Sequence, residues 1–358
     1  MPDCEEFNLT NRDNFFHIIN GGAPEKIPFT LSLCDNLLEK FQSKYHTNDY
    51  ESVFDIPFRS VGILPSRNPI DYSSFFTKGE IDYFDEYGTG YKKGSVAHFA
   101  RFISPMRNYS TVDQIKSFPM SDFLADYRWE GLGKRIESLK NDDKIVVGSG
   151  PAIQIFEPAW YLRGMENLLC DMLDNEEIAE ACLNRIAEIK YEVARRFALY
   201  GADVIIYGDD VGTERGMMMD PETWRKWLKP KLKKAITVAK EANPNVLCYY
   251  HCDGDIHLII DDLIECGMDI LNPVQPECMD PIKIYNQYHD RISIWGCIGT
   301  QTTMPFGTVP DVKRKTQELI DVCGNTGRLI LAPTHLLEPE VPLENVEAFV
   351  DTIHNFQR

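Results

Sequence analysis

The sequence predicts an α/β protein, a distorted (β/α)8 barrel in one domain with an irregular N-terminal extension. From about residue 144 onward, short β-branched runs alternate with longer amphipathic stretches, the pattern of a parallel sheet with crossover helices. The length of 358 residues suits such a barrel, which commonly takes roughly 200 to 400 residues. A G-x-G-x-x-G motif after an early strand and a G-x-x-x-x-G-K-[ST] motif are both missing, so a dinucleotide-binding fold and a phosphate-loop hydrolase have no support.

The alternation can be assigned element by element. Pro221 directly after Asp220 is a helix start signal, with Asp as the N-cap and Pro at the first helical position. Gly267 and Gly324 follow predicted helix ends, where glycine commonly closes a helix. The predicted strands are residues 145–148, 203–207, 246–250, 269–271, 293–295 and 329–332, and the predicted helices are 166–200 (one helix or two), 221–242, 256–266, 281–288 and 309–323.

The first 140 residues are less regular and rich in aromatic residues. They predict helices at 11–19 and 36–45, a strand at 29–33, and a strand–turn–strand unit at 81–92, where polar and apolar residues alternate around a Gly turn. We therefore expect residues 1–140 to form an N-terminal extension with the first barrel elements. Residues 141–358 are expected to form the remainder of the barrel.

Composition limits the classes of function. The chain has 37 basic and 55 acidic residues, a net charge of −18 and a pI near 4.9, which argues against binding to nucleic acid or to an anionic membrane surface. No apolar run approaches the roughly 20 residues of a membrane span, and the polar N-terminus does not resemble a secretion signal, so we expect a cytoplasmic protein. The ten cysteines contain no C-x-x-C pair and predict reduced thiols.

Polar residues gather where the predicted strands end. In α/β barrels the active site lies at the carboxyl ends of the strands, so these positions predict a site together, although each alone also fits a loop residue or a helix N-cap, as Asp255 does. The residues are Glu157 after the first of these strands, Asp209 and Asp210 after the second, His251, Cys252 and Asp253 after the third, Asn272, Gln275, Glu277 and Cys278 after the fourth, and Thr334 and His335 after the last.

Two of these residues form an H-x-D pair. His251 and Asp253 stand two apart in an extended segment, so their side chains should lie on the same side. His335 could supply a third ligand and leave one position open, which is the arrangement of a catalytic zinc ion. A histidine that is hydrogen-bonded within the barrel, without a metal, is the alternative.

Several long segments resemble a known family. They are IFEPAWYLRGMENLLCDML, GDDVGTERGMMMDPETWRKWLKP, YYHCDGDIHLIIDDLIECGMDILNPVQPECMD, IWGCIGTQTTMPFGT and LILAPTHLLEPEVPLENVEAF. They resemble the uroporphyrinogen decarboxylase-like superfamily, specifically its corrinoid-dependent methyltransferase branch and the methyltransferase components of O-demethylase systems. The resemblance implies a distorted (β/α)8 barrel. An RQAGRY-like segment, typical of the decarboxylases, is missing, which argues against porphyrinogen decarboxylation.

The departures from the family pattern shape the expected chemistry. Thiol-methylating members bind zinc through H-x-C and a later Cys, and here the corresponding set would be His251, Asp253 and His335. Two imidazoles and one carboxylate leave about +1 on Zn²⁺ and are harder ligands, so the ion would act on oxygen better than on sulfur. The expected reaction is transfer of a methyl group from a methyl ether, such as a methoxylated aromatic, to cob(I)alamin. A thiol, a methylamine or a pterin as methyl donor or acceptor, and a decarboxylase-like barrel, remain alternatives.

The resemblance also implies partners. A D-x-H-x-x-G cobalamin-binding motif is missing, so the cobalamin is expected on a separate corrinoid protein that docks transiently, in an anaerobic cytoplasm. Related decarboxylases form dimers, so a homodimer is possible here.

Further residues are candidates for the site. Cys278 is an alternative metal ligand, and Cys252 should point to the opposite face from its neighbours. Glu157 and Asp210 could supply a fourth ligand or an acid for the leaving oxygen, or could instead be paired with Arg163 or Arg215. Tyr207, with Trp295 and Tyr87, could form a wall for an aromatic ring, although such rings more often belong to the core.

Overall fold

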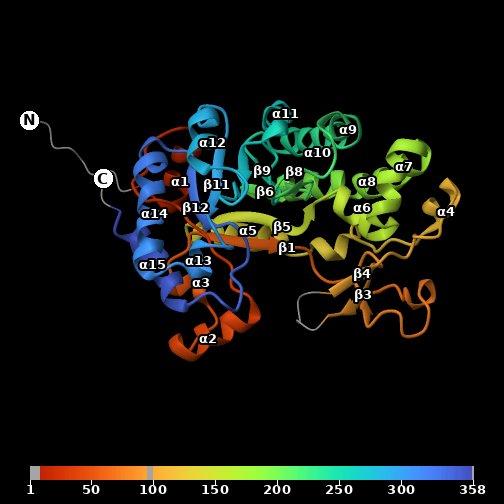
Figure 1. Cartoon of the computed structure of the whole chain (residues 1–358), viewed down its shortest axis with the longest axis horizontal. Coiled ribbons are helices and arrows are strands. Elements are labelled where there is room, and N and C mark those ends of the chain that lie inside the picture. Colours follow the sequence, from red (N-terminus) through yellow and green to blue (C-terminus); the bar gives the residue numbers. More distant parts are fainter. Residues whose placement is uncertain (1–8, 95–99, 357–358) are drawn as a thin grey trace, which may run out of the picture.

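A parallel sheet with helices packed around it forms the centre of the molecule (Figure 1). The computed structural model describes residues 9–94 and 100–356. Within these residues the sheet has seven strands in the order β1-β5-β6-β9-β10-β11-β12, and every neighbouring pair is parallel. The strands are β1 (Phe58–Gly62), β5 (Ile145–Ile153), β6 (Val204–Gly208), β9 (Leu247–His251), β10 (Ile270–Asn272), β11 (Ser293–Ile298) and β12 (Leu329–Pro333).

The eighth barrel position is occupied by the segment predicted as strand 29–33. Phe29 forms an isolated parallel bridge with Leu331 of β12, and Leu33 forms another with Leu337, which lies beyond the end of β12. Pro28 accepts a hydrogen bond from the Leu331 N–H. The two bridges are four residues apart on the N-terminal segment and six apart on the other, so the register breaks between them and no regular strand forms. Buried side chains from this segment and from the sheet form one contiguous core. The distorted barrel in a single domain is thus confirmed.

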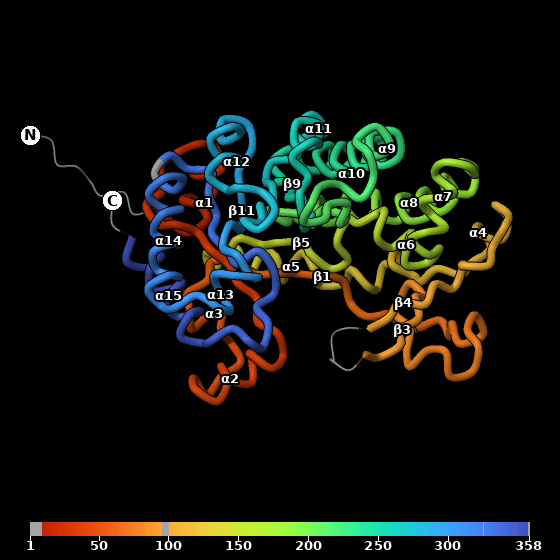
Figure 2. Tube along the Cα trace, viewed as in Figure 1, coloured from red at the N-terminus to blue at the C-terminus, as the bar shows by residue number. Residues whose placement is uncertain are grey.

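From β5 onward, helices mostly alternate with strands along the chain and pack around the sheet. The short helix α1, near the N-terminus, and α14, from the C-terminal part of the chain, lie at the same end of the molecule (Figures 1 and 2). No helix in the described part of the chain is long and apolar enough to cross a membrane. The helices are α1 (Asn11–Ile19), α2 (Asp35–Tyr45), α3 (Tyr50–Val53), α4 (Val112–Ser117), α5 (Leu132–Asn141), α6 (Phe156–Arg163), α7 (Met165–Asp174), α8 (Glu176–Tyr200), α9 (Pro221–Trp227), α10 (Lys229–Ala242), α11 (Ile260–Cys266), α12 (Pro281–Tyr288), α13 (Thr303–Phe306), α14 (Val309–Cys323) and α15 (Leu343–His354).

Several predicted helix boundaries need correction. The stretch 221–242 is two helices, because Pro230 has no N–H to continue α9 and instead stands in the first turn of α10. Residues 256–266 begin with a 3-10 turn (His257–Ile259) before α11. Gly324 does not take the left-handed conformation, since its φ is −71° and the chain continues through a 3-10 turn to Gly327, where φ is +81°. By contrast, Asp220 caps α9 and Gly267 closes α11 with φ +97°, as predicted.

A second, three-stranded antiparallel sheet lies beside α6 (Figure 1). Its strands are β2 (Tyr83–Phe84), β3 (Gly90–Lys93) and β4 (Ala100–Ile103), so the predicted strand–turn–strand unit at 81–92 is confirmed. Phe102 of β4 packs its ring against Trp160 and Tyr161 of α6, with centroids 5.5 and 4.8 Å away. These rings join the small sheet to the barrel.

Close approach of strands requires glycine at Gly296 in β11. A Cβ there would lie 2.1 Å from the Pro273 carbonyl oxygen, and φ is +137°. We expect Gly296→Ala to lower the free energy of unfolding by roughly 2–3 kcal/mol, through overpacking and backbone strain, as measured by urea denaturation. Gly131→Ala is the control, since Gly131 also has a positive φ but open space around it, and should cost about 1 kcal/mol. An equal cost for the two variants would contradict the steric argument.

Candidate metal centre

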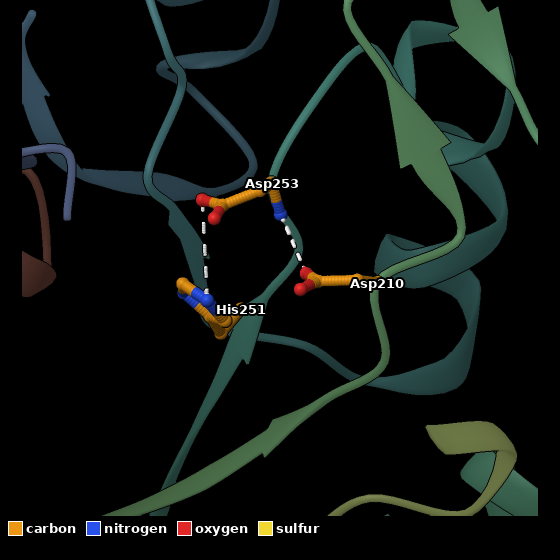
Figure 3. Close-up of side chains that lie close together, drawn as sticks. All are labelled: Asp210, His251 and Asp253. Carbon is orange, nitrogen blue, oxygen red and sulfur yellow. Dashed lines mark hydrogen bonds and ion pairs between the residues drawn. The ribbon is translucent and has the colours of Figure 1, made fainter. Parts of the chain in front are cut away.

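Three ligand-type side chains meet at the carboxyl ends of β6 and β9 (Figure 3). His251 is the last residue of β9, Asp253 follows two residues later, and Asp210 follows β6. One nitrogen or oxygen atom of each lies within 4.8 Å of the corresponding atoms of the other two. The Asp253 backbone N–H donates to Asp210 Oδ1 at 2.8 Å, which fixes the two loops against each other.

Asn272 of β10 determines which nitrogen of His251 is free. The Asn272 amide Nδ2 donates to the Trp295 carbonyl at 2.7 Å, so its Oδ1 must be the atom that lies 2.6 Å from His251 Nδ1. An amide oxygen can only accept, and Nδ1 therefore carries the proton. In the neutral imidazole the lone pair is then on Nε2, which lies 4.0 Å from Asp253 Oδ1. A neutral imidazole held in this tautomer is suited to a metal ion.

The Asp253 carboxylate lies between two imidazoles. Its Oδ1 is 4.0 Å from His251 Nε2, and its Oδ2 is 4.0 Å from His335 Nε2. Burial raises the pKa of Asp253, and the two histidines oppose this rise. A divalent cation among these groups would favour the ionised carboxylate in the same way as a nearby positive charge.

The predicted ligands are thus brought together only in part. His251 and Asp253 converge, Asp210 joins them, and His335 reaches Asp253 from the far side with its side chain about half exposed. Cys278 is not part of any metal-type cluster among residues 9–94 and 100–356. Burial and the nearby Glu214 raise the pKa of its thiol to about 11, which disfavours the thiolate that a metal needs.

Glu157 lies in the first turn of α6, next to this cluster. Its carboxylate accepts hydrogen bonds from Gln154 Nε2 (2.6 Å), Tyr161 Oη (3.0 Å) and the Asp210 backbone N–H (3.3 Å). Burial, and then the charge of Asp210, raise its pKa. The alternative of an ion pair with Arg163 is wrong, because Arg163 binds Asp171 at 2.7 Å. The Arg215 side chain is exposed.

The buried Asp209 positions Glu157. Its carboxylate accepts hydrogen bonds from the backbone N–H groups of Ile155 (3.0 Å) and Glu157 (2.9 Å), and so attaches the start of α6 to the end of β6. Burial, followed by the charge of Glu157, raises the pKa of Asp209 to about 8. Lys190, buried nearby, donates to Tyr87 Oη and to the Ala152 carbonyl, and burial lowers its pKa to about 7.

Tyr207 does not lie at this centre. It pairs in register with Tyr250, and both face the helices, whereas the alternation of β9 places His251 on the opposite face. The Tyr207 side chain is fully buried, and its hydroxyl donates to the Ala235 carbonyl of α10 at 3.4 Å. Trp295 likewise belongs to the core, with its ring against those of Phe58 and Tyr249. The predicted aromatic wall is therefore not formed by these residues.

A cavity of about 560 Å³ adjoins the centre and shares Asp253 and His335 with it. Its size is that of a site for a small organic molecule. The remaining described lining comes from the segments that follow β6, β9, β10, β11 and β12: Gly212, Thr213, Glu214, Gly254, Gln275, Thr300, Gln301, Phe306, Thr334, Leu336, Glu338 and Glu340.

The donor atoms fit a divalent cation such as zinc. An imidazole nitrogen and carboxylate oxygens are borderline-to-hard ligands that zinc accepts, and the cavity leaves space for a substrate at an open position. The support of His251 by Asn272 is the hydrogen bond that metal-binding histidines characteristically make.

This support leads to a testable expectation for Asn272. Asn272→Ala should weaken zinc binding about 10- to 100-fold, because the His251 ring loses the acceptor that fixes its tautomer. Isothermal calorimetry with zinc alone measures this. Asn272→Asp keeps the acceptor and should restore most of the affinity. Asn184→Ala, at a partly exposed position on α8 outside the cluster, should have no effect. An unchanged dissociation constant in Asn272→Ala would remove Asn272 from the account.

Comparisons of the sequence and of the fold with known proteins identify the family of this chain. A family model described as Uroporphyrinogen decarboxylase (URO-D) matches residues 89–356. Two proteins from Methanosarcina barkeri, both named Methylcobamide:CoM methyltransferase MtaA, are 27% and 28% identical over 174 residues, or 49% of this chain. The match covers 48% of each of them, so the chain spans about half the length of these curated relatives. A solved structure described as a methyltransferase from Methanosarcina mazei has the same fold, with a TM-score of 0.71 over 98% of this chain and 99% of that one, at 18% identity.

Proposed function

Because this chain belongs to the uroporphyrinogen decarboxylase family, we propose that it is one of the family's corrinoid-dependent methyltransferases. It transfers a methyl group from a methyl ether, a methoxylated aromatic, to cob(I)alamin carried by a separate corrinoid protein. The printed names of the two Methanosarcina barkeri relatives support methyl transfer involving a cobamide. The observation that carries the proposal is the cluster of Asp210, His251 and Asp253 beside a cavity of small-molecule size.

Zinc is the proposed metal. His251 and Asp253 would hold it, with Asp210 or His335 as the third ligand. When bound, the ion supplies a Lewis acid that polarises an ether oxygen and makes it a better leaving group. The donor set contains no thiolate and is harder than a set of His and two Cys, which favours oxygen over sulfur.

The chain's own residues prepare the site for this reaction. Asn272 holds His251 in the required tautomer, and Asp209 holds the start of α6 so that Glu157 stays beside Asp210. Because burial raises its pKa, Glu157 keeps a proton on its carboxyl group more readily than an exposed glutamate does. We assign it as the acid that protonates the departing oxygen. The corrinoid protein docks transiently over the mouth of the barrel, in an anaerobic cytoplasm suited to strongly reducing cob(I)alamin.

Methyl transfer between a cobamide and CoM is the second candidate, favoured by the printed names of the relatives. The test mixes the protein with corrinoid protein in the cob(I)alamin state and a panel of methoxylated aromatics. Appearance of the methyl–cobalt absorbance with some donors supports ether demethylation. Methylation of CoM from methylcobamide, with no reaction from any ether, would replace the first candidate with the second.

A further inference from the structure

We infer that the side-chain amide of Gln275 donates a hydrogen bond to a negatively charged ligand oxygen in the cavity beside the metal centre. In the proposed reaction this is the oxygen from which the methyl group leaves. The inference rests on the proposed function for that assignment, whereas the contacts that support it are those of Gln275 itself.

Gln275 is a buried polar residue in the lining of this cavity. Only 7% of its surface is exposed, and it lines the cavity together with Asp253 and His335. Its side-chain Oε1 accepts a hydrogen bond from the Gly254 backbone N–H at 3.4 Å. A backbone N–H can only donate, so this contact sets the orientation of the amide and identifies the other atom as Nε2.

The Nε2 of Gln275 is left without an acceptor. Among residues 9–94 and 100–356 it makes no hydrogen bond, and it is not one of the unpartnered side-chain atoms that the protein encloses completely. Its N–H groups are therefore open to the cavity that Gln275 lines. A buried donor without a partner costs free energy, and a ligand oxygen that accepts from it recovers this cost.

A strained turn holds the amide in place. Val274 is fully buried and has a φ of +49°, which is an outlier for a β-branched residue. Such strain persists only where the surrounding structure fixes the conformation. On either side of Val274, Asn272 contacts His251 and Gln275 contacts Gly254. The turn thus directs two amide side chains to the metal centre.

The position of the amide suits the departing oxygen. Gly254 directly follows Asp253, so the Gln275 amide contacts the segment that carries a proposed metal ligand. In the transfer, the carbon–oxygen bond breaks and leaves its electron pair on the oxygen, while the new carbon–cobalt bond uses the electron pair of cob(I)alamin. The oxygen takes its proton from Glu157, and the N–H groups stay on Gln275. Because negative charge grows on the oxygen, the hydrogen bond from Nε2 is stronger in the transition state than in the bound ether.

Two ligands that share one ring, 4-nitroanisole and 4-nitrophenolate, test this inference. They differ in the methyl group and in the charge on the oxygen. Their dissociation constants are measured by calorimetry with the zinc-loaded protein, at a pH that ionises the nitrophenol. Gln275→Met removes the amide and keeps the length of the side chain. It should weaken 4-nitrophenolate binding about 10-fold or more and 4-nitroanisole binding less than about 3-fold. Its kcat for methyl–cobalt formation from 4-nitroanisole should fall about 100-fold, with KM nearly unchanged.

Two further variants serve as controls. Gln275→Glu keeps an acceptor for the Gly254 N–H but has no amide donor, so it should show the same loss of 4-nitrophenolate binding. Gln317→Ala removes the same type of side chain from an exposed position on α14 and should leave binding and kcat unchanged. Retained binding of 4-nitroanisole and retained zinc content show that the cavity is intact in each variant.

The outcomes separate this inference from the proposed function. Equal losses for the two ligands, or no loss for either, would overturn the inference while leaving ether demethylation intact. Selective loss of 4-nitrophenolate binding with an unchanged kcat would overturn the role of Gln275 in the transfer. Selective loss of 4-nitrophenolate binding, in a protein whose wild type forms no methyl–cobalt from any ether, would support the amide as a donor to an anionic oxygen and refute the ether donor.

Discussion

His251→Ala is expected to abolish tight zinc binding and to reduce methyl transfer by roughly 1,000-fold or more. The imidazole Nε2 is the one nitrogen donor in the cluster with Asp210 and Asp253, and its loss leaves two neighbouring carboxylates without a partner. A lost Lewis acid forfeits several kcal/mol of transition-state stabilisation, which corresponds to this factor. Zinc content after gel filtration and the rate of methyl–cobalt formation are the two measurements.

His257→Ala is the matched control, because His257 is exposed and paired with Asp255 outside the cluster. It should retain full zinc content and full activity. The same two assays, zinc content and the rate of methyl–cobalt formation, identify the third ligand. His335→Ala should lower zinc occupancy and stop methyl transfer if His335 binds the ion. Asp210→Asn should have these effects if Asp210 binds the ion instead. Unchanged rates in His251→Ala would remove the metal centre from the mechanism.

Asp209→Ala is expected to lower the free energy of unfolding by about 3 kcal/mol. The substitution leaves the buried N–H groups of Ile155 and Glu157 without their acceptor, and each unsatisfied buried donor costs about 1–3 kcal/mol. It also frees the start of α6, so activity should fall with stability as Glu157 moves. Thermal unfolding with kcat measured in parallel tests both effects. Asp126→Ala, at a side chain that is 98% exposed, should change stability by less than about 0.5 kcal/mol.

Asp209 also makes the free energy of unfolding depend on pH. Folding raises the pKa of Asp209 from 3.8 to about 8, so between these values the folded state binds a proton that the unfolded state does not. This contribution is complete below about pH 4 and is lost as pH rises towards 8, with a slope of up to about 1.4 kcal/mol per pH unit. Asp209→Asn cannot titrate and should show a flatter profile over this range. Identical profiles would mean that Asp209 is already ionised in the folded protein.

The alternating strands and helices of the barrel were predictable because the signals for each element lie within that element or in the residues next to it. Fully buried strands such as β11 and β12 read as continuous apolar runs, and caps such as Asp220 act on the next turn. One failure also had a local cause: Pro230 was a visible signal for the break between α9 and α10. The eighth strand is reduced to two bridges because the register shifts between them, which no local pattern shows.

The site was less predictable because it depends on strand register. The H-x-D spacing predicted that His251 and Asp253 lie on one side, as they do in the structure. Asp210 joins this cluster through a hydrogen bond from the Asp253 backbone, which no sequence spacing predicts. Asn272 ends a neighbouring strand, yet its support of His251 follows from the pairing of β10 with β9. The prediction for Tyr207 failed because the alternation of side chains along β6 turns Tyr207 towards α10. Whether Tyr207 and His251 point to the same face can be known only from the register between β6 and β9.

The most direct test of the account is a zinc-soaked crystal measured at the zinc absorption edge. The account predicts one anomalous peak per chain, about 2.0–2.2 Å from His251 Nε2 and from an Asp253 carboxylate oxygen, with Asp210 or His335 as the next protein ligand. The nearby cavity should open onto the remaining coordination position. A peak elsewhere on the chain, with His251 and Asp253 bound only to each other or to water, would contradict the metal centre and the chemistry derived from it.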